Sequence, residues 1–189
     1  RESGVQPMAL LSMMARLGSS DPIELRSNMD ELISGFEINH FGSAPTKFDE
    51  TDLLPLTGKY LQMLPFSEVQ DNIYALGVPV EMAELFWLVM RDNIETLGDL
   101  ESWWKLCRDG AEPVIEEGDA EFVAKAMILL PDGPFTSETW GTWTTAVKVA
   151  TGNKGRQLFM PLRKALTGQT HGPDMASFMP LLQVVKARV

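Results

Sequence analysis

Apolar residues recur along this chain at intervals of three and four, the spacing that places side chains on one face of an α-helix. Stripes of this kind cover residues 10–17, 29–36, 53–64, 82–90, 97–104, 122–130, 140–147 and 175–185. No convincing alternation of apolar and polar residues interrupts them, so the pattern predicts little or no sheet. We therefore expect an all-α chain of about ten short helices, with the methionine and tryptophan side chains of the stripes in its core.

Residues that begin or break helices flank several of these stripes. Asn28 is a good N-cap for the second stripe, and Thr136 is expected to cap the helix that follows it. Ser67 with Gln70 has the pattern of a capping box and predicts another helix start. Pro161 cannot donate a backbone hydrogen bond, so a kink is predicted at that position.

The character of the chain changes at two places. The first change falls near Pro65, and the second falls in the stretch 110–118, which is rich in glycine and glutamate. We expect these breaks to divide the chain into residues 1–65, 66–112 and 113–189.

The charge is unevenly distributed. The 189 residues carry a formal net charge of -10, which by itself argues against a nucleic-acid-binding protein. The 35 residues from Thr139 to Pro173 nevertheless contain no Asp or Glu, and their cations are Lys148, Lys154, Arg156, Arg163 and Lys164. Such a run is either a solvated face or a phosphate-facing patch that steers a polyanion to one end of an acidic body.

The chain offers few residues for catalysis or metal binding. Cys107 is the single cysteine and His40 and His171 are the two histidines, which excludes an internal disulfide, a cysteine-based zinc site and a histidine-rich metal centre. The segment 152–156 has glycines and cations but lacks the Lys-Ser/Thr ending of a P-loop. We expect a binding module without a cofactor or metal of its own, in a reducing compartment, most simply the cytoplasm.

Two further absences bear on location. No run of about 18 apolar residues is present, so no transmembrane helix is expected. No secretory signal pattern begins the chain, which starts with Arg1 and is expected to be processed or cut from something longer.

Three stretches, 7–18, 35–49 and 155–168, together resemble the C-terminal half of bacterial glutamyl-tRNA synthetases. The third is the most specific, because it combines Met-Pro-Leu-Arg and Leu-Thr-Gly at fixed spacing and is followed by Gly172-Pro173. The resemblance covers essentially the whole chain. Three positions depart from the pattern, since Asp52, His40 and Met160 stand where the family often carries a cation.

The resemblance implies stem-contact helices in residues 1–65, followed by an α-helix cage that binds the anticodon loop. Residues 66–112 and 113–189 would be the two anticodon-binding subdomains of this superhelical bundle. The parent enzyme joins L-glutamate to tRNA(Glu) with ATP and Mg²⁺ in a Rossmann domain, whose two ATP-binding signatures are not in this chain. The fragment alone is therefore expected to be inactive.

The resemblance also implies partners. We expect a monomer that binds tRNA(Glu), with tRNA(Gln) as an alternative, and neither DNA nor membrane. The rival interpretation is a helical protein–protein adaptor derived from a synthetase, which the net charge of -10 favours.

The residues expected to touch tRNA lie mostly in the acid-free segment. Gln157 and Arg163 are expected to reach base edges or the loop backbone, because an unpaired loop exposes its bases for reading. Short hydroxyl and amide contacts are expected from Thr167, Gln169 and Thr170.

Phosphate contacts are expected from Lys154, Arg156 and Lys164. In the family an arginine in the region of Arg91 reads an anticodon base, although an arginine at a helix C-terminus is also stabilised by the helix dipole alone. Arg163 could equally form a structural ion pair, and Gln157 could be a solvated helix residue.

Overall fold

The computed structural model describes residues 4–43 and 46–188, which contain α-helices and short 3-10 helices but no strand. The α-helices are α1 (Pro7–Met14), α2 (Met29–Ser34), α3 (Leu53–Met63), α4 (Phe66–Ala75), α5 (Val80–Met90), α6 (Asp99–Asp109), α7 (Ala120–Ile128), α8 (Thr139–Thr151), α9 (Arg156–Thr167) and α10 (Met175–Phe178). Turns of 3-10 helix cover Ile38–His40, Glu50–Asp52, Arg91–Asn93, Glu117–Asp119, Met179–Leu181 and Lys186–Arg188. The all-α prediction is confirmed.

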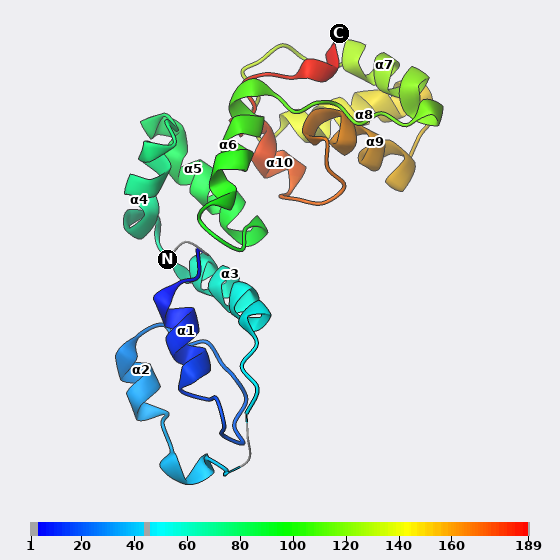
Figure 1. The fold of residues 1–189 in the computed structure, drawn as a ribbon. Coiled ribbons are helices and arrows are strands. Elements are labelled where there is room, and N and C mark those ends of the chain that lie inside the picture. Colours follow the sequence, from blue (N-terminus) through cyan, green and yellow to red (C-terminus); the bar gives the residue numbers. More distant parts are fainter. Residues whose placement is uncertain (1–3, 44–45, 189) are drawn as a thin grey trace.

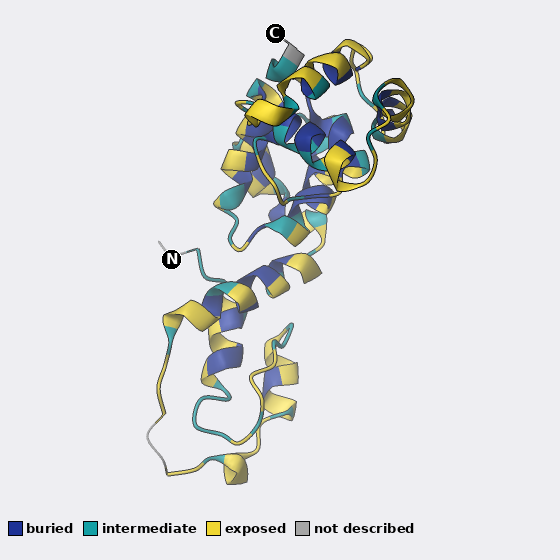
Figure 2. Cartoon of the chain, turned by 90° about the vertical axis from the view of Figure 1, so that its right-hand side faces the viewer, coloured by how far each residue is buried: buried dark blue, intermediate teal, exposed yellow. Residues whose placement is uncertain are grey.

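The helices form two groups that stand end to end (Figure 1). A small cluster of Ala9, Met13, Leu53 and Leu56 joins α1 to α3. A larger cluster begins at Leu61 and unites α4 to α10, and most buried residues lie in this upper group (Figure 2). Helix α3 contributes to both clusters and so connects the two groups. The expected divisions at residues 65 and 112 stay predictions.

Tryptophans anchor the larger cluster. Trp103, Trp104 and Trp143 are buried, as the stripes predict, while Trp140 is half-buried. The indole Nε1 of Trp143 donates a hydrogen bond of 2.8 Å to the carbonyl oxygen of Ala126, which satisfies its polar atom inside the core. This bond ties α8 to α7.

Helices α4 and α5 pack against each other, and the 3-10 turn Arg91–Asn93 that follows α5 packs on α3. The fully buried Trp87 of α5 donates from Nε1 to the carbonyl oxygen of Leu64 at 3.1 Å. No single helix in the described part of the chain is long and apolar enough to cross a membrane. The pair formed by α4 and Val80–Asn93 meets that test of length and composition, with a bend of 115° between its two parts.

The predicted helix starts are correct at one position and wrong at two. The Asn28 side chain accepts a hydrogen bond of 2.9 Å from the Glu31 amide, so this N-cap is confirmed. The capping box at Ser67 is wrong, because α4 begins at Phe66 and places Ser67 inside the first turn. Helix α8 begins at Thr139 rather than after Thr136, and its Thr139 hydroxyl accepts from the Thr136 amide at 2.8 Å.

Prolines act differently in the last two helices. Helix α9 continues through Pro161, and the kink expected there stays a prediction. The carbonyl of Gln157 loses its helical donor there, but Gln157 is exposed and water can replace that donor. The single C-terminal helix expected over residues 175–185 is wrong. Helix α10 ends at Phe178 and a 3-10 turn follows, because Pro180 cannot continue the α-helical hydrogen bonding.

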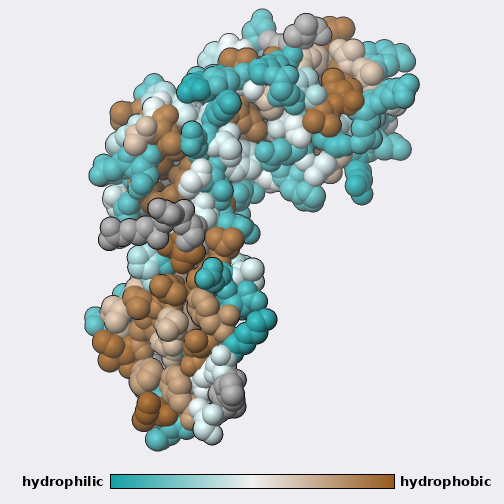
Figure 3. Space-filling view, viewed as in Figure 1, coloured by the Kyte–Doolittle hydropathy of each residue, from teal (hydrophilic) through white to brown (hydrophobic). Residues whose placement is uncertain are grey.

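Two predicted core stripes, 10–17 and 29–36, lie partly on the surface instead. The apolar face of α1 and α2 is exposed, with Met14 at 51% and Ile33 at 66% of their full accessibility. Its members are Leu10, Leu11, Met14, Met29, Ile33 and Phe36. Figure 3 shows apolar residues gathered over this lower group. The burial expected for Met14 and Met29 is therefore wrong, because α2 has only six residues and no further described helix covers it.

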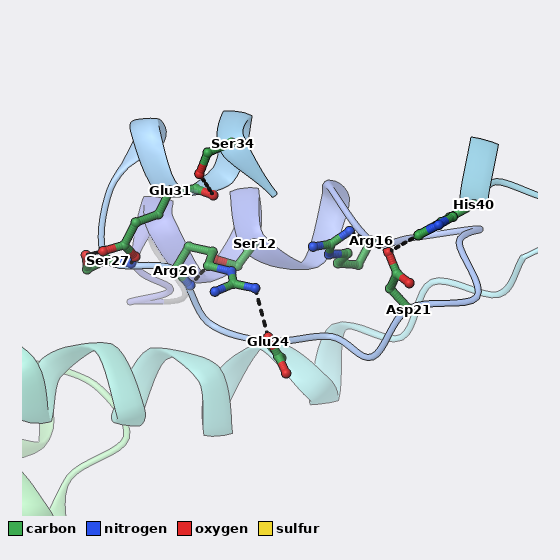
Figure 4. A network of polar contacts seen from close by, with 9 residues as sticks. All are labelled: Ser12, Arg16, Asp21, Glu24, Arg26, Ser27, Glu31, Ser34 and His40. Carbon is green, nitrogen blue, oxygen red and sulfur yellow. Dashed lines mark hydrogen bonds and ion pairs between the residues drawn. The ribbon is translucent and has the colours of Figure 1, made fainter. Parts of the chain in front are cut away.

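A polar network fixes the loops that follow α1 (Figure 4). The Asp21 carboxylate accepts a hydrogen bond of 2.7 Å from Arg16 Nη1 and one of 2.9 Å from His40 Nδ1. The hydrogen bond from His40, followed by the charges of His40 and Arg16, lowers the pKa of Asp21. Backbone hydrogen bonds from Ser20 to His40 and from Gly42 to Gly18, both 3.0 Å, close the same loops.

We predict that Asp21→Asn accelerates hydrogen exchange of the Ser20 and Gly42 amides at pH 7. Since the pKa of Asp21 is lowered in the folded state, its stabilising effect is present above the ordinary aspartate pKa and is lost as the pH falls through the lowered value. The difference between variant and wild type should therefore vanish at low pH. Asp71→Asn, which removes an exposed carboxylate on α4, is the control. Equal exchange in all three proteins at pH 7 contradicts this role for Asp21.

Candidate nucleic-acid interface

The acid-free segment folds into α8, α9 and the loops that follow each of them. Helix α8 ends at Gly152, whose φ of +76° is the left-handed conformation that glycine adopts without strain. The chain then turns through Lys154 into α9. No carboxylate lies between Thr139 and Pro173, so these two helices meet at a connection without acidic side chains of its own.

Three exposed cations surround this connection. Lys148 lies in the last turn of α8, Lys154 in the loop, and Arg156 at the first position of α9. We call this group the α8–α9 tip. None of the three side chains forms a hydrogen bond or an ion pair with residues in the described ranges. Their charges therefore face solvent and can attract an anion.

Lys164 is engaged within the protein. Its ammonium group pairs with the Glu116 carboxylate, and only 15% of the Lys164 side chain is exposed. This hydrogen bond and the charge of Lys164 lower the pKa of Glu116. The Val114 amide also donates to the Lys164 carbonyl oxygen at 3.2 Å, so α9 is held to the 110–118 stretch. Lys164 is consequently not a free cation of the α8–α9 tip.

Arg163 supports the loop between α9 and α10. Its Nη2 atom donates a hydrogen bond of 2.8 Å to the Pro173 carbonyl oxygen. Burial lowers the pKa of the Arg163 guanidinium, while the charge of Asp174 opposes that shift. A Cβ atom on Gly172 would come within 2.9 Å of the Trp103 ring and 3.4 Å of Arg163 Nη1. The close packing around Gly172 therefore holds this loop against Arg163, through a hydrogen bond to a carbonyl rather than the ion pair expected as the structural alternative.

The remaining polar candidates differ in exposure. Thr167 is buried, and its hydroxyl donates to the Arg163 carbonyl oxygen at 2.8 Å and accepts from the Gln169 amide at 3.2 Å. Gln169 and Thr170 are exposed, and so is Gln157 on the first turn of α9. The buried Thr167 is thus a loop anchor, whereas the other three can reach a ligand.

Arg91 lies apart from the α8–α9 tip, as the separation of α5 from the start of α9 in Figure 1 shows. It begins the 3-10 turn that packs on α3, and its buried Nε atom has no hydrogen-bond partner among the described residues. Its nearest acid is Asp92, at 4.0 Å from Nε. Arg91 therefore retains a donor that its own neighbours do not satisfy.

A groove of about 310 Å³ adjoins this turn. We call it the α5–α10 groove, and its lining residues are Leu85, Leu88, Val89, Asp92, Asn93, Pro173, Asp174 and Ser177. The turn that begins at Arg91 thus forms one wall, and the loop that Arg163 holds forms the other. The carboxylates of Asp92 and Asp174 and the amide of Asn93 can pair with base edges, whereas the two carboxylates repel phosphate.

The sequence did not identify several of these residues as parts of a binding site. Lys148 was recognisable as a cation of the acid-free segment, but its position beside the α8–α9 connection depends on where α8 ends. Asp174 precedes α10 and caps it, since its side chain accepts a hydrogen bond of 2.9 Å from the Ser177 amide. Nothing in the sequence indicates that Asp174 lies opposite Asp92.

The described residues show no arrangement suited to metal binding or nucleophilic catalysis. They contain no group of three or more His, Cys, Asp or Glu side chains that could hold a metal ion. The Cys107 thiol is buried, and burial raises its pKa to about 12, so it is protonated at neutral pH.

Comparison with known proteins agrees with a binding role. Residues 80–186 match the family model described as anticodon binding domain. The chain is 66% identical over 188 residues to Glutamate--tRNA ligase 1 of Roseobacter denitrificans and 63% identical to Glutamate--tRNA ligase 2 of a Ruegeria species. In both cases the match covers 100% of this chain and 43% of the relative, so the chain spans less than half of the relatives' length.

Solved structures share the fold. A glutamate tRNA ligase from Elizabethkingia meningosepticum, crystallised with its amino acid, superposes with a TM-score of 0.74 at 23% identity. The glutamate-tRNA synthetase of Elizabethkingia anophelis gives a TM-score of 0.71 at 22% identity. Each match covers 96% of this chain and 39% of the other chain, so the similarity extends over both groups of helices.

We predict that Arg163→Ala lowers the free energy of unfolding by about 1–3 kcal/mol, because it leaves the Pro173 carbonyl without its donor. Lys164→Ala should cost less, because the Glu116 carboxylate that it leaves unpaired is 65% exposed and is solvated by water. Urea denaturation at pH 7 measures both. A larger loss for Lys164→Ala than for Arg163→Ala would contradict the supporting role of Arg163.

Proposed function

This chain belongs to the family of anticodon-binding domains, and we propose that it is the tRNA-binding region of a glutamate–tRNA ligase. Such a ligase joins L-glutamate to tRNA(Glu) and uses ATP and Mg²⁺. The relatives that carry this name are more than twice as long as the match, so we assign the ligation chemistry to the rest of such a protein. The region described here binds tRNA and positions it.

One observation carries this proposal. The α8–α9 tip presents three exposed, unpaired cations on a chain whose net charge is -10. Most of such a surface repels a polyanion, and the α8–α9 tip attracts it. The polyanion therefore approaches this end of the molecule in a preferred orientation. Phosphate groups of the tRNA backbone are the ligands that this tip suits best.

The other candidate residues divide into readers and supports. Gln157, Gln169 and Thr170 are exposed and can reach the backbone or base edges of the loop. Arg91, whose side chain is 32% exposed, lies beside the α5–α10 groove and is the candidate base reader there. Arg163 and Thr167 shape the loop, and a phosphate contact by Lys164 would require exchange of its Glu116 partner.

The remaining assignments follow from the same proposal. We assign residues 1–65 to stem contact and residues 66–112 and 113–189 to two anticodon-binding subdomains. We propose tRNA(Glu) as the partner of a cytoplasmic monomer, with tRNA(Gln) as the alternative, and neither DNA nor membrane as a ligand. The comparisons lend no support to the protein–protein adaptor.

The test is a titration of fluorescently labelled tRNA(Glu) at several salt concentrations, followed by anisotropy. Lys154→Ala combined with Arg156→Ala should weaken binding and reduce the slope of log K against log[salt] by roughly 0.7–0.9 for each phosphate that is no longer neutralised. The matched control is Lys105→Ala combined with Lys125→Ala, which removes the same charge from exposed positions on α6 and α7 that are not among the proposed tRNA contacts. Equal affinities and slopes for the two double variants would overturn the proposal that the α8–α9 tip binds phosphate.

A further inference from the structure

We propose that Phe159 is a stacking platform for an unpaired base of the bound RNA, beside the phosphate-binding Arg156. This inference rests on the proposed tRNA-binding function. It adds a residue that stacks on an unpaired base without distinguishing one base from another. It is drawn from the exposure, the ring contacts and the charge environment of Phe159.

Phe159 is a supported but open aromatic ring. It lies on the first turn of α9, and 45% of its surface is exposed. Its ring centroid is 6.2 Å from that of Trp140, with 35° between the planes. Trp140 in turn packs edge-on against the buried Trp143 at 5.6 Å. The chain of rings anchors Phe159 to the core while leaving nearly half of it in water.

A cation lies on the same helical face. Arg156 precedes Phe159 by three residues, a spacing that brings side chains of a helix side by side. Arg156 is exposed and unpaired with any described residue, and Lys154 lies in the adjoining loop. Single-stranded nucleic acid is bound by this combination, in which cations follow the phosphates and aromatic rings stack on the bases.

The charges of the segment that carries Phe159 favour an anionic ligand. The segment that carries Phe159 has no carboxylate from Thr139 to Pro173, so an anionic ligand meets no repulsion from it. Ile128 at the end of α7 and Val149 on α8 are also exposed and apolar, but neither has a ring on which a base can stack. In a duplex the bases are already stacked on each other, so the ligand that fits both ring and cation is an unpaired RNA loop.

Three substitutions separate stacking from simple packing. Phe159→Tyr keeps the aromatic face, Phe159→Leu keeps apolar bulk without that face, and Phe159→Ala removes both. Binding of the labelled anticodon stem-loop of tRNA(Glu) to the full 189-residue chain is measured by anisotropy at several salt concentrations. Circular dichroism of each variant confirms that the helices are retained.

The inference predicts that Phe159→Leu and Phe159→Ala weaken binding about 5- to 150-fold, the range that removal of one base–aromatic stack produces. Phe159→Tyr should bind within about twofold of wild type. The salt slope should not change in any of the three, because no charge is removed, whereas Arg156→Ala should reduce it. A duplex RNA of the same stem without an unpaired loop should bind wild type and Phe159→Ala equally.

Different results would overturn the stacking role of Phe159 and the proposed tRNA-binding function. Wild-type affinity for Phe159→Leu, or equal weakening on duplex RNA, would overturn stacking while leaving the proposed function in place. If the wild-type chain itself shows no salt-dependent binding of the stem-loop, the proposed function and the stacking role are both rejected.

Discussion

The separation of charge along this chain is the constraint on which its proposed function depends. A molecule with a net charge of -10 repels nucleic acid unless its cations are gathered where carboxylates are absent. Here 35 consecutive residues contain neither Asp nor Glu, and they fold into α8, α9 and their loops. The connection between these helices therefore presents positive charge at one end of the upper group (Figure 1).

Packing decides which of the five cations in that segment remain available. The α8–α9 connection leaves Lys148, Lys154 and Arg156 exposed to solvent. Helix α9 packs against the acidic 110–118 stretch, where Lys164 forms an ion pair with Glu116. The guanidinium of Arg163 turns inward to the Pro173 carbonyl. The same helix thus supplies a free cation at its start and structural cations near its end, so phosphate attraction and loop positioning come from different residues.

Periodicity in the sequence predicts the helices well, because a stripe at intervals of three and four requires a helix whatever it packs against. It does not predict what covers a stripe, and the exposed side chains of Met14 and Ile33 show this limit. It also does not predict how a helix responds to proline: α9 continues through Pro161, whereas α10 ends before Pro180 and the helix expected over 175–185 is cut short. For the site, charge composition indicates the cationic segment, whereas the pairing of Lys164 with Glu116, 48 residues apart, depends on the tertiary fold.

Hydrogen–deuterium exchange of the chain with and without the anticodon stem-loop of tRNA(Glu) tests the central claim most directly. Amides from 148 to 160 are placed at the phosphate-binding end by this account and should exchange more slowly in the complex. Unchanged exchange throughout 148–160 in a complex that has demonstrably formed would contradict it, because the RNA would then be held by another part of the molecule.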